Sequence, residues 1–296
     1  MVKYKALKII FILCIFFLFS FLLSRNFNNI DFSDKIVLIP IKGTIVSDDG
    51  GFLSEDVVTS SEIINYLKKA KEDSTIKAVI LEINSPGGTA IGSKEIVDVV
   101  RDFNKPVVAW IRSIGASGAY WIASASDVIV ADQLSITGSI GVIGSYLEFE
   151  GLMSKYGVKY ERLVTGKYKD IGSPYKTLTE EERQLLLNKL NTIHKIFSDD
   201  VSKNRNKNLS KYSTGEFFLG LEAKEIGLVD FLGGKETAIN ITKKLANIDD
   251  AKLIAFTHKK GLFSSLDKYF SRYSYYFGVG ISEGLLVNNG DLVITT

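Results

Sequence analysis

Three glycine-rich stretches of the sequence carry residues that could do chemistry. In one, Ser117 lies between small residues, so a substrate carbonyl group could approach its hydroxyl, and the N–H of Gly118 could face the carbonyl oxygen. Another carries Lys167 and Lys169, and the remaining one is a Pro-Gly-Gly turn whose free backbone N–H groups could face an anion. The stretches are Asn84–Gly88, Ser113–Trp121 and Gly166–Pro174.

Each stretch taken alone has an ordinary structural explanation: a strand-to-helix turn, a small-residue patch for helix packing, or a solvated charged turn. Together they indicate catalysis. A serine hydroxyl is a weak nucleophile that needs an adjacent base. The sequence has only two histidines, His194 and His258, and neither has a promising context. A neutral lysine replaces histidine in the Ser-Lys variants of the catalytic triad.

The elements between these stretches alternate in type. Short runs rich in β-branched residues predict buried strands, and periodic apolar positions between them predict helices. The alternation favours βαβ units, an α/β fold and a mostly parallel sheet. The expected strands are Ile36–Ile41, Ile76–Ile83, Val107–Ile111, Asp127–Ala131 and Val158–Val164. The expected helices are Ser60–Lys71, Ile91–Phe103, Gly115–Ser126, Thr179–Val201 (opened by a capping box of Thr179 and Glu182) and Lys235–Ala246.

The N-terminus predicts a membrane anchor. Three lysines precede the uncharged run Ile9–Ser24, and residues 6–24 are long enough to span a bilayer as one helix. A cleaved signal peptide is the main alternative and a buried core helix a weaker one, but the run ends in bulky residues where a cleavage site has small ones. The flanking charges predict a cytoplasmic N-terminus, with the rest of the chain outside the cell membrane.

The remaining composition sets limits on function. The formal net charge of +2 provides no basic field for a nucleic-acid partner, and the single cysteine excludes an internal disulfide framework or a cysteine-rich metal site. We expect a linker at 25–34, a catalytic domain at 35–246, and an aromatic-rich appendage at 247–296 that contacts the membrane or another subunit. We expect neither a metal nor another cofactor.

The sequence resembles the membrane-anchored signal peptide peptidases of the Ser-Lys type, which have a crotonase-like fold related to the Clp proteases. The resemblance covers roughly residues 36 to 246. It rests on NSPGG at 84–88, GASGAYWIAS at 115–124, TGSIGVIG at 137–144 and GKYKDIGSPYKTLTEEE at 166–182.

The resemblance implies a role for each matching residue. Ser117 would be the nucleophile and Lys169 the general base. Gly88 and Gly118 would donate the oxyanion-hole N–H groups, with Gly87 beside them in the substrate-binding turn. Ser139 would place a hydroxyl near the lysine amine. Where family members more often show glycine and then tyrosines, this chain has Ala119-Tyr120-Trp121, which we expect to narrow the pocket beside the nucleophile.

Further expectations concern the geometry and assembly of the site. We expect one chain to supply both dyad residues, with Lys169 pointing toward Ser117 and Ser139, and with Asp170 turned away toward Lys167 or Arg183. The resemblance also implies a homo-oligomer that cuts signal peptides or similar short apolar peptides.

Three alternatives remain open. One is a related Ser-Lys protease that cuts a specific membrane partner. The more remote ones are a non-catalytic membrane scaffold and an acyl-CoA hydratase, which would need acid-base carboxylates that the glycine turns at 84–88 and 113–121 lack.

Overall fold

The computed structural model describes residues 13, 15–17, 33–48 and 57–257. The chain forms two units, residues 1–256 and 257–296. The first unit is a mixed α/β structure built on a mostly parallel sheet. In the described residues, the path through the main sheet runs β10-β1-β4-β5-β6-β9, with β7 paired to β5, and β8 antiparallel to β7. A separate parallel pair joins β2 and β3.

The strands have the following bounds: β1 Lys35–Lys42, β2 Thr44–Val46, β3 Val57–Thr59, β4 Ile76–Ser85, β5 Val107–Ala116, β6 Val128–Ala131, β7 Ile136–Gly138, β8 Phe217–Leu219, β9 Phe231–Leu232 and β10 Lys252–Ala255. The helices are α2 Ser60–Glu72, α3 Ala90–Arg101, α4 Gly118–Ser124, α5 Glu150–Lys155, α6 Glu180–Asn204, α7 Gly220–Ile226 and α8 Lys235–Leu245, with a 3-10 turn at Ser210–Tyr212.

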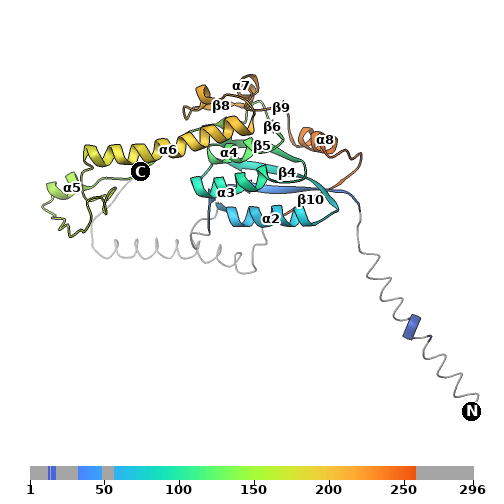
Figure 1. The fold of residues 1–296 in the computed structure, drawn as a ribbon, viewed down its shortest axis with the longest axis horizontal. Coiled ribbons are helices and arrows are strands. Elements are labelled where there is room, and N and C mark those ends of the chain that lie inside the picture. The colour runs from blue at the N-terminus through green and yellow to red at the C-terminus, as the bar shows by residue number, and fades with distance from the viewer. Residues whose placement is uncertain (1–12, 14, 18–32, 49–56, 258–296) are drawn as a thin grey trace, which may run out of the picture. The chain divides into compact units, whose positions relative to one another are not determined.

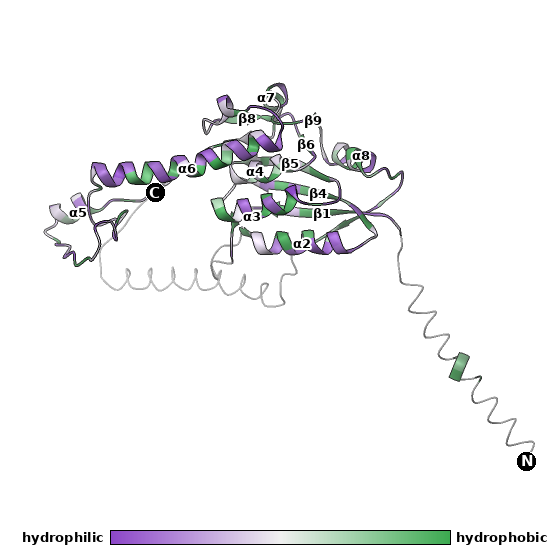
Figure 2. Cartoon of the chain, in the orientation of Figure 1, coloured by the Kyte–Doolittle hydropathy of each residue, from purple (hydrophilic) through white to green (hydrophobic). Residues whose placement is uncertain are grey.

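The central strands separate two apolar clusters because their side chains alternate between the faces of the sheet. In β4, Val79 and Leu81 face the larger cluster, which includes residues of α2, α3 and α4, while Ala78 and Ile80 face the smaller cluster with Ala238 of α8. Both faces are covered, which explains why the strands read as near-continuous apolar runs. Figure 2 shows these strands as largely hydrophobic, while α2 and α6 alternate between hydrophobic and hydrophilic positions.

Most predicted elements are present, with two corrections. Residues 158–164 form no strand: Val158, Tyr160 and Leu163 are exposed, and the segment pairs with no described strand. The helix expected at Gly115–Ser126 is also shorter, because β5 continues to Ala116 and α4 begins at Gly118. The capping box at the start of α6 is confirmed: Thr179 Oγ1 accepts from Glu182 N, and the Glu182 side chain accepts from Thr179 N.

Helix α6 begins well outside the sheet and ends against it. At its C-terminal end, Phe197 is buried and stacks on Trp121 of α4, with ring centroids 4.6 Å apart. The N-terminal half of α6 and residues 141–179 form what we call the arm, residues 141–192. Figure 1 shows α6 extending from the sheet, with α5 beside its far end. Within the arm Glu182 is the one buried residue, so this segment has no apolar core of its own.

The structure describes only parts of the expected membrane anchor and of the expected C-terminal appendage. No helix within the described residues is both long and apolar enough to cross a bilayer. Most of the expected anchor at 6–24 lies outside those residues, apart from a few helical positions, Leu13 and 15–17. At the other end, β10 pairs with β1, so residues 247–256 of the expected appendage belong to the sheet unit, and residues 258–296 lie outside the described part.

Candidate active site

Ser117 lies at the turn between β5 and α4. Its backbone has φ 54° and ψ −127°, a positive-φ conformation that is unfavourable for a residue other than glycine. The turn is held on both sides, because Ser117 N donates to Gly138 O at 2.8 Å and Trp121 N donates to Ser117 O at 3.0 Å. A strained strand-to-helix turn of this kind exposes the hydroxyl of a serine nucleophile at the end of a parallel sheet.

The turn from β4 to α3 carries Gly87 and Gly88. Its shape is fixed by the buried Ser85, whose Oγ accepts from Gly87 N at 3.1 Å. The backbone of Ile45 runs beside it: Ile45 N donates to Gly87 O at 2.9 Å, and Thr89 N donates to Ile45 O at 2.8 Å. Because these two bonds use the neighbours of Gly88, the N–H of Gly88 itself points away from Ile45.

The two turns are in contact with each other. A Cβ placed on Gly87 would lie 2.9 Å from Ser117 Cβ and 2.8 Å from Gly118 N. A Cβ placed on Gly118 would lie 3.5 Å from Gly88 N. Neither Gly88 N nor Gly118 N donates a hydrogen bond to any atom of the described chain. Two adjacent free N–H groups beside a serine hydroxyl match the geometry of an oxyanion hole.

Ser139 lies on the nucleophile side of the site. It follows β7, whose last residue, Gly138, pairs with Ala116 and accepts the Ser117 N–H. Its backbone also has a positive φ, 51°, and its N–H donates to Glu216 O at 2.8 Å. The structure therefore brings Ser139 together with Ser117 and the three glycines.

Lys169 is not brought to Ser117. Its side chain is exposed in a turn in which Lys169 N donates to Gly166 O at 3.1 Å. This turn is fixed to the start of α6 by an ion pair of Lys167 with Glu181, at 2.6 Å. Glu181 and Phe197 are separated by roughly 24 Å along the helix, at 1.5 Å per residue. The expectation that one chain places Lys169 against Ser117 is therefore wrong for this structure, because the arm carries the lysine away from the sheet.

Asp170 has different partners from those expected. Its carboxylate accepts from both Nε and Nη2 of Arg162, the latter at 2.8 Å, and lies 3.7 Å from Lys176 Nζ. The hydrogen bonds from Arg162 are the main reason that the pKa of Asp170 is lowered to about 2. Lys167 instead pairs with Glu181, and Arg183 lies 3.7 Å from Glu180. The prediction that Asp170 turns toward Lys167 or Arg183 was wrong.

The residues after Ser117 pack in the core instead of narrowing a pocket. Ala119, Tyr120 and Trp121 are buried, Tyr120 OH donates to Leu228 O at 2.9 Å, and Trp121 stacks on Phe197. The pKa of Tyr120 is raised, mainly because the side chain is buried. The departure from the family pattern therefore affects how α4 packs against α6.

Sequence reasoning missed a residue beside the glycine turns. Ser93 of α3 is fully buried, its Oγ has no hydrogen-bond partner in the described chain, and it lies 2.1 Å from where a Cβ on Gly118 would stand. The spacing of Ser93, five residues after Gly88, was the available signal, since the first turn of a helix lies close to the loop before it.

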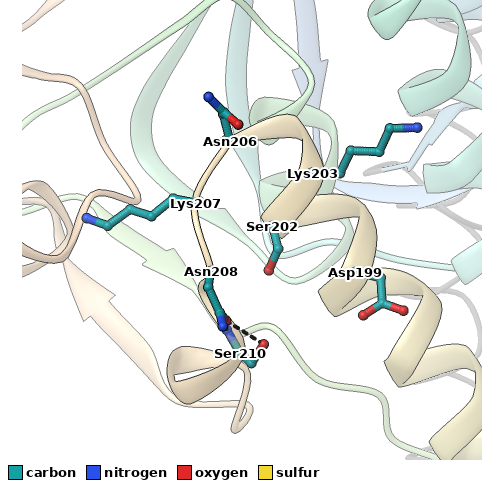
Figure 3. A pocket seen from close by; sticks show the side chains of 7 residues that line it. All are labelled: Asp199, Ser202, Lys203, Asn206, Lys207, Asn208 and Ser210. Atoms are coloured by element: carbon teal, nitrogen blue, oxygen red, sulfur yellow. Dashed lines mark hydrogen bonds between the residues drawn. The ribbon is translucent and has the colours of Figure 1, made fainter.

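A separate shallow pocket of about 480 Å³ lies at the C-terminal end of α6. Two of its lining residues, Lys203 and Lys207, point in opposite directions (Figure 3), and Asn208 accepts from Ser210. None of the residues selected from the sequence lines it. The described residues also contain no group of three or more His, Cys, Asp or Glu side chains that could hold a metal ion.

Comparison with known proteins gives the family. Residues 100–249 match the model of peptidase family S49. The chain belongs to this family. A putative protease of Methanocaldococcus jannaschii, MJ0651, is 32% identical over 297 residues, which is 95% of this chain and 93% of the relative. A putative signal peptide peptidase, SppA, of Enterococcus faecium is 33% identical, over 78% of this chain and 69% of the relative.

The fold also matches that of a solved structure. A variant of the 1510-N membrane-bound stomatin-specific protease, in complex with a substrate peptide, superposes with a TM-score of 0.53 over 81% of this chain and 99% of the solved chain, at 14% identity. This likeness concerns the fold. The S49 assignment confirms that the chain is a serine peptidase of the signal peptide peptidase type.

Proposed function

We propose that this S49 peptidase is a membrane-bound serine endopeptidase of the crotonase and Clp fold class, in which Ser117 is the nucleophile and Lys169 the general base. The observation that carries this proposal is the turn at Ser117, which sets a half-buried hydroxyl beside the free N–H groups of Gly88 and Gly118. No metal and no other cofactor takes part.

The reaction needs one proton carrier. The neutral amine of Lys169 removes the proton from Ser117 as Oγ attacks the peptide carbonyl carbon, and the N–H groups of Gly88 and Gly118 bind the oxyanion. The lysine ammonium then protonates the leaving amine, which releases the first product and leaves an acyl-enzyme. Water, deprotonated by Lys169, hydrolyses that ester and restores the serine.

A second copy of the chain supplies the lysine in this proposal. The arm holds Lys169 away from the Ser117 of its own chain and leaves its side chain exposed. A lysine that acts as a base needs a buried site, because burial favours the neutral amine. The arm also exposes apolar side chains that a neighbour would cover, among them Ile143 at 91% and Leu163 at 87%. Docking of the arm on a neighbouring copy would complete the site and remove the lysine from water.

The membrane part of the proposal rests on the sequence. The apolar run at 9–24 anchors the chain once, with the N-terminus in the cytoplasm and the catalytic unit outside the cell membrane. A site tethered by the short linker 25–34 stays near the bilayer, where cleaved signal peptides and similar short apolar peptides are released. Protease added to intact cells stripped of any outer layer should digest the catalytic unit; digestion only in inverted vesicles would reverse this orientation.

A complementation experiment tests the dyad. The variants S117A and K169A should each assemble but cleave a fluorogenic apolar peptide at background rate, and K169R should be equally inactive because a guanidinium stays charged. The two inactive alanine variants, unfolded together and reassembled at equal amounts, should recover roughly a quarter of the wild-type activity, because one site in four then pairs an intact serine with an intact lysine from its neighbour.

The outcomes separate the two parts of the proposal. If either single variant keeps substantial activity, the dyad is misassigned. If both are inactive and their mixture stays inactive although mixed oligomers form, the dyad stands and the lysine comes from the same chain. A strictly monomeric mass for the active protein would also exclude the second copy.

A second candidate is a protease that cuts one specific membrane partner. It is favoured by the structural likeness to a protease that is described as stomatin-specific. The two functions can be distinguished by what accumulates in cells that carry S117A in place of the wild-type chain. Accumulation of many short apolar peptides supports the broad function, and accumulation of one uncut membrane protein supports the specific one.

A further inference from the structure

The turn that carries Lys169 fixes the residues on both sides of the lysine and leaves the lysine itself without a partner. Tyr168 OH donates to Glu181 at the start of α6, and Asp170 is held by Arg162. In the described part of the chain, the Lys169 side chain makes no hydrogen bond and no ion pair, and it is exposed. The turn therefore presents one lysine on a tethered backbone.

The tether on the Asp170 side is a row of alternating charges. Arg162 contacts Asp170 through two nitrogens, and Lys176 Nζ lies 3.7 Å from the same carboxylate. Lys176 then pairs with Glu182 at 2.5 Å, and Glu182 accepts from Thr179 N at 3.1 Å in the capping box of α6. A two-point arginine–carboxylate contact fixes orientation as well as distance. The row thus joins the lysine turn to the start of α6.

These ion pairs contribute more than usual to holding the arm together, because apolar packing is weak there. The side chain of Asp170 is 11% exposed and that of Glu182 is 6% exposed, although the apolar residues around them remain half-buried or exposed. Arg162 lies in the segment 158–164, which forms no strand and so has no ladder of backbone hydrogen bonds to hold it. Two contacts attach this segment to the turn and the residues just after it: Arg162 with Asp170, and the ring of Tyr160 with that of Tyr175, whose centroids are 5.4 Å apart.

Asp170 is also the carboxylate next to the proposed base in the sequence. An opposite charge within about 4–6 Å favours the charged form of a titratable group, so a free Asp170 would hold the proton on Lys169. Two cations neutralise Asp170 in the structure and direct it toward Arg162. The charged and titratable groups around the turn are Tyr160, Arg162, Lys167, Tyr168, Asp170, Lys176, Glu181 and Glu182.

We propose that Arg162 is a positioning residue for Lys169: by its two-point contact it holds Asp170 away from the lysine amine and fixes the turn that presents the lysine. This inference rests on the proposed function of Lys169 as the general base. It also gives the segment 158–164 a role in catalysis, which its lack of secondary structure would not suggest.

The test is the pH–rate profile of the assembled full-length enzyme, measured as kcat/KM on an apolar fluorogenic peptide. In R162Q the carboxylate of Asp170 loses its two-point contact and keeps only Lys176, 3.7 Å away, so it is free to turn toward Lys169. The midpoint of the rising limb should then move up by about one pH unit, so that the rate at neutral pH falls about tenfold. In the double variant R162Q/D170N the midpoint should return to the wild-type value while the maximal rate stays reduced, because the charge is gone but the tether is still broken.

The controls separate charge from general damage. Arg183 is an exposed arginine of the same arm, 3.7 Å from Glu180. R183Q removes the same charge as R162Q but breaks no contact with Asp170, so it should leave the midpoint unchanged. R162K keeps the positive charge without the two-point contact and should keep the wild-type midpoint with a lower maximal rate. The oligomer mass of every variant is measured alongside.

The inference is overturned if R162Q keeps the wild-type midpoint, or if R162Q/D170N shows the same raised midpoint as R162Q. Should R162Q fail to assemble, the midpoints of R162K and D170N decide instead, and a rise in D170N contradicts the proposal because that variant has no carboxylate to release. An active S117A enzyme in the same assay would overturn the proposed function itself, which is a different result.

Discussion

The turn at Ser117 and the turn at Lys169 are built in opposite ways. Around Ser117 the backbone is held by hydrogen bonds between strands and loops, and the glycines allow contacts that a single Cβ would block. Around Lys169 the contacts are side-chain ion pairs on an arm whose one buried residue is a glutamate. The serine half of the proposed site is therefore held by backbone hydrogen bonds and the lysine half by charges. In the proposed oligomer a neighbouring copy would also cover the lysine half. Substitutions around Ser117 should therefore act by steric effects. Substitutions around Lys169 should change how activity and arm stability depend on pH.

Among the variants that test this contrast, the largest effect is expected from Gly88→Ala. The new Cβ would lie 1.9 Å from Ile45 O, a backbone atom that cannot turn aside, so the turn must shift and its N–H must leave the oxyanion position. Losing one oxyanion donor costs about 10²–10³ in kcat. The measurement is kcat on an apolar peptide, with KM and the oligomer mass followed in parallel.

Gly118→Ala is the matched variant because its obstacle is a side chain. Its Cβ would lie 2.1 Å from Ser93 Oγ, and with that oxygen removed the next contact is Ser93 Cβ at 3.0 Å. The double variant G118A/S93A should therefore recover about tenfold over G118A alone, out of a loss of the size given for one oxyanion donor. S93A should give no recovery to G88A. Equal rescue of both alanine variants would contradict the steric account.

Much of the serine half could be predicted from the sequence because its information is local. The run Ile76–Ile83 and the Pro-Gly-Gly after it specify a strand and a turn within a dozen residues, and the same holds for Val107–Ile111 and Ser117. The exact start of α4 could not be predicted, because small residues such as Gly115 and Ala116 suit a strand end and a helix start equally well. The bridge from Ile45 to the Gly88 turn was missed because it joins distant parts of the chain.

For the lysine half, the sequence indicates which residues matter but not where they lie in the fold. Val158–Val164 has the β-branched and aromatic composition of a strand, but strand formation depends on a partner, and the arm offers none. The separation of Ser117 and Lys169 in sequence does not give their separation in space. What decides it is the long helix α6, which is anchored by Phe197 and Val201 in the core, so that its other end lies outside.

Acid should loosen the arm before it affects the sheet. Bonds from Arg162 to Asp170 and from Lys176 to Glu182 lower the pKa of both carboxyls, and that of Asp170 falls to about 2. Their ion pairs therefore stabilise the folded arm fully above the ordinary carboxyl range of roughly 4, and this contribution is lost as the pH falls toward 2. Pepsin, which cuts in acid, should cleave within 147–163 slowly at pH 4 and several-fold faster at pH 2, relative to an unfolded reference protein.

The matched variant for this experiment is D170N, which has no carboxyl to titrate at that position. Its cleavage in the arm should be faster than that of the wild type already at pH 4 and should change less between pH 4 and pH 2. Cleavage of the wild-type arm that follows the reference protein over the whole range would contradict the ion-pair account.

The smallest effect is expected at the capping box, where the arm meets α6. Thr179→Ala removes the Oγ that accepts from Glu182 N, which costs about 1 kcal/mol at a helix N-terminus. Because the first turn of α6 lies in the arm and not in the core, this loss should appear as local opening: the amides of the first turn should exchange hydrogen about fivefold faster, while the free energy of global unfolding stays nearly unchanged. The control is Thr192→Ala on the same helix, whose Oγ donates back to Asn188 O, an interaction that does not favour the helix. T192A should leave exchange in the first turn as it is in the wild type. If T179A instead lowers the global free energy of unfolding by the full amount, the arm and the sheet unfold together, and the contrast between a serine half held by backbone hydrogen bonds and a separately held lysine half is wrong.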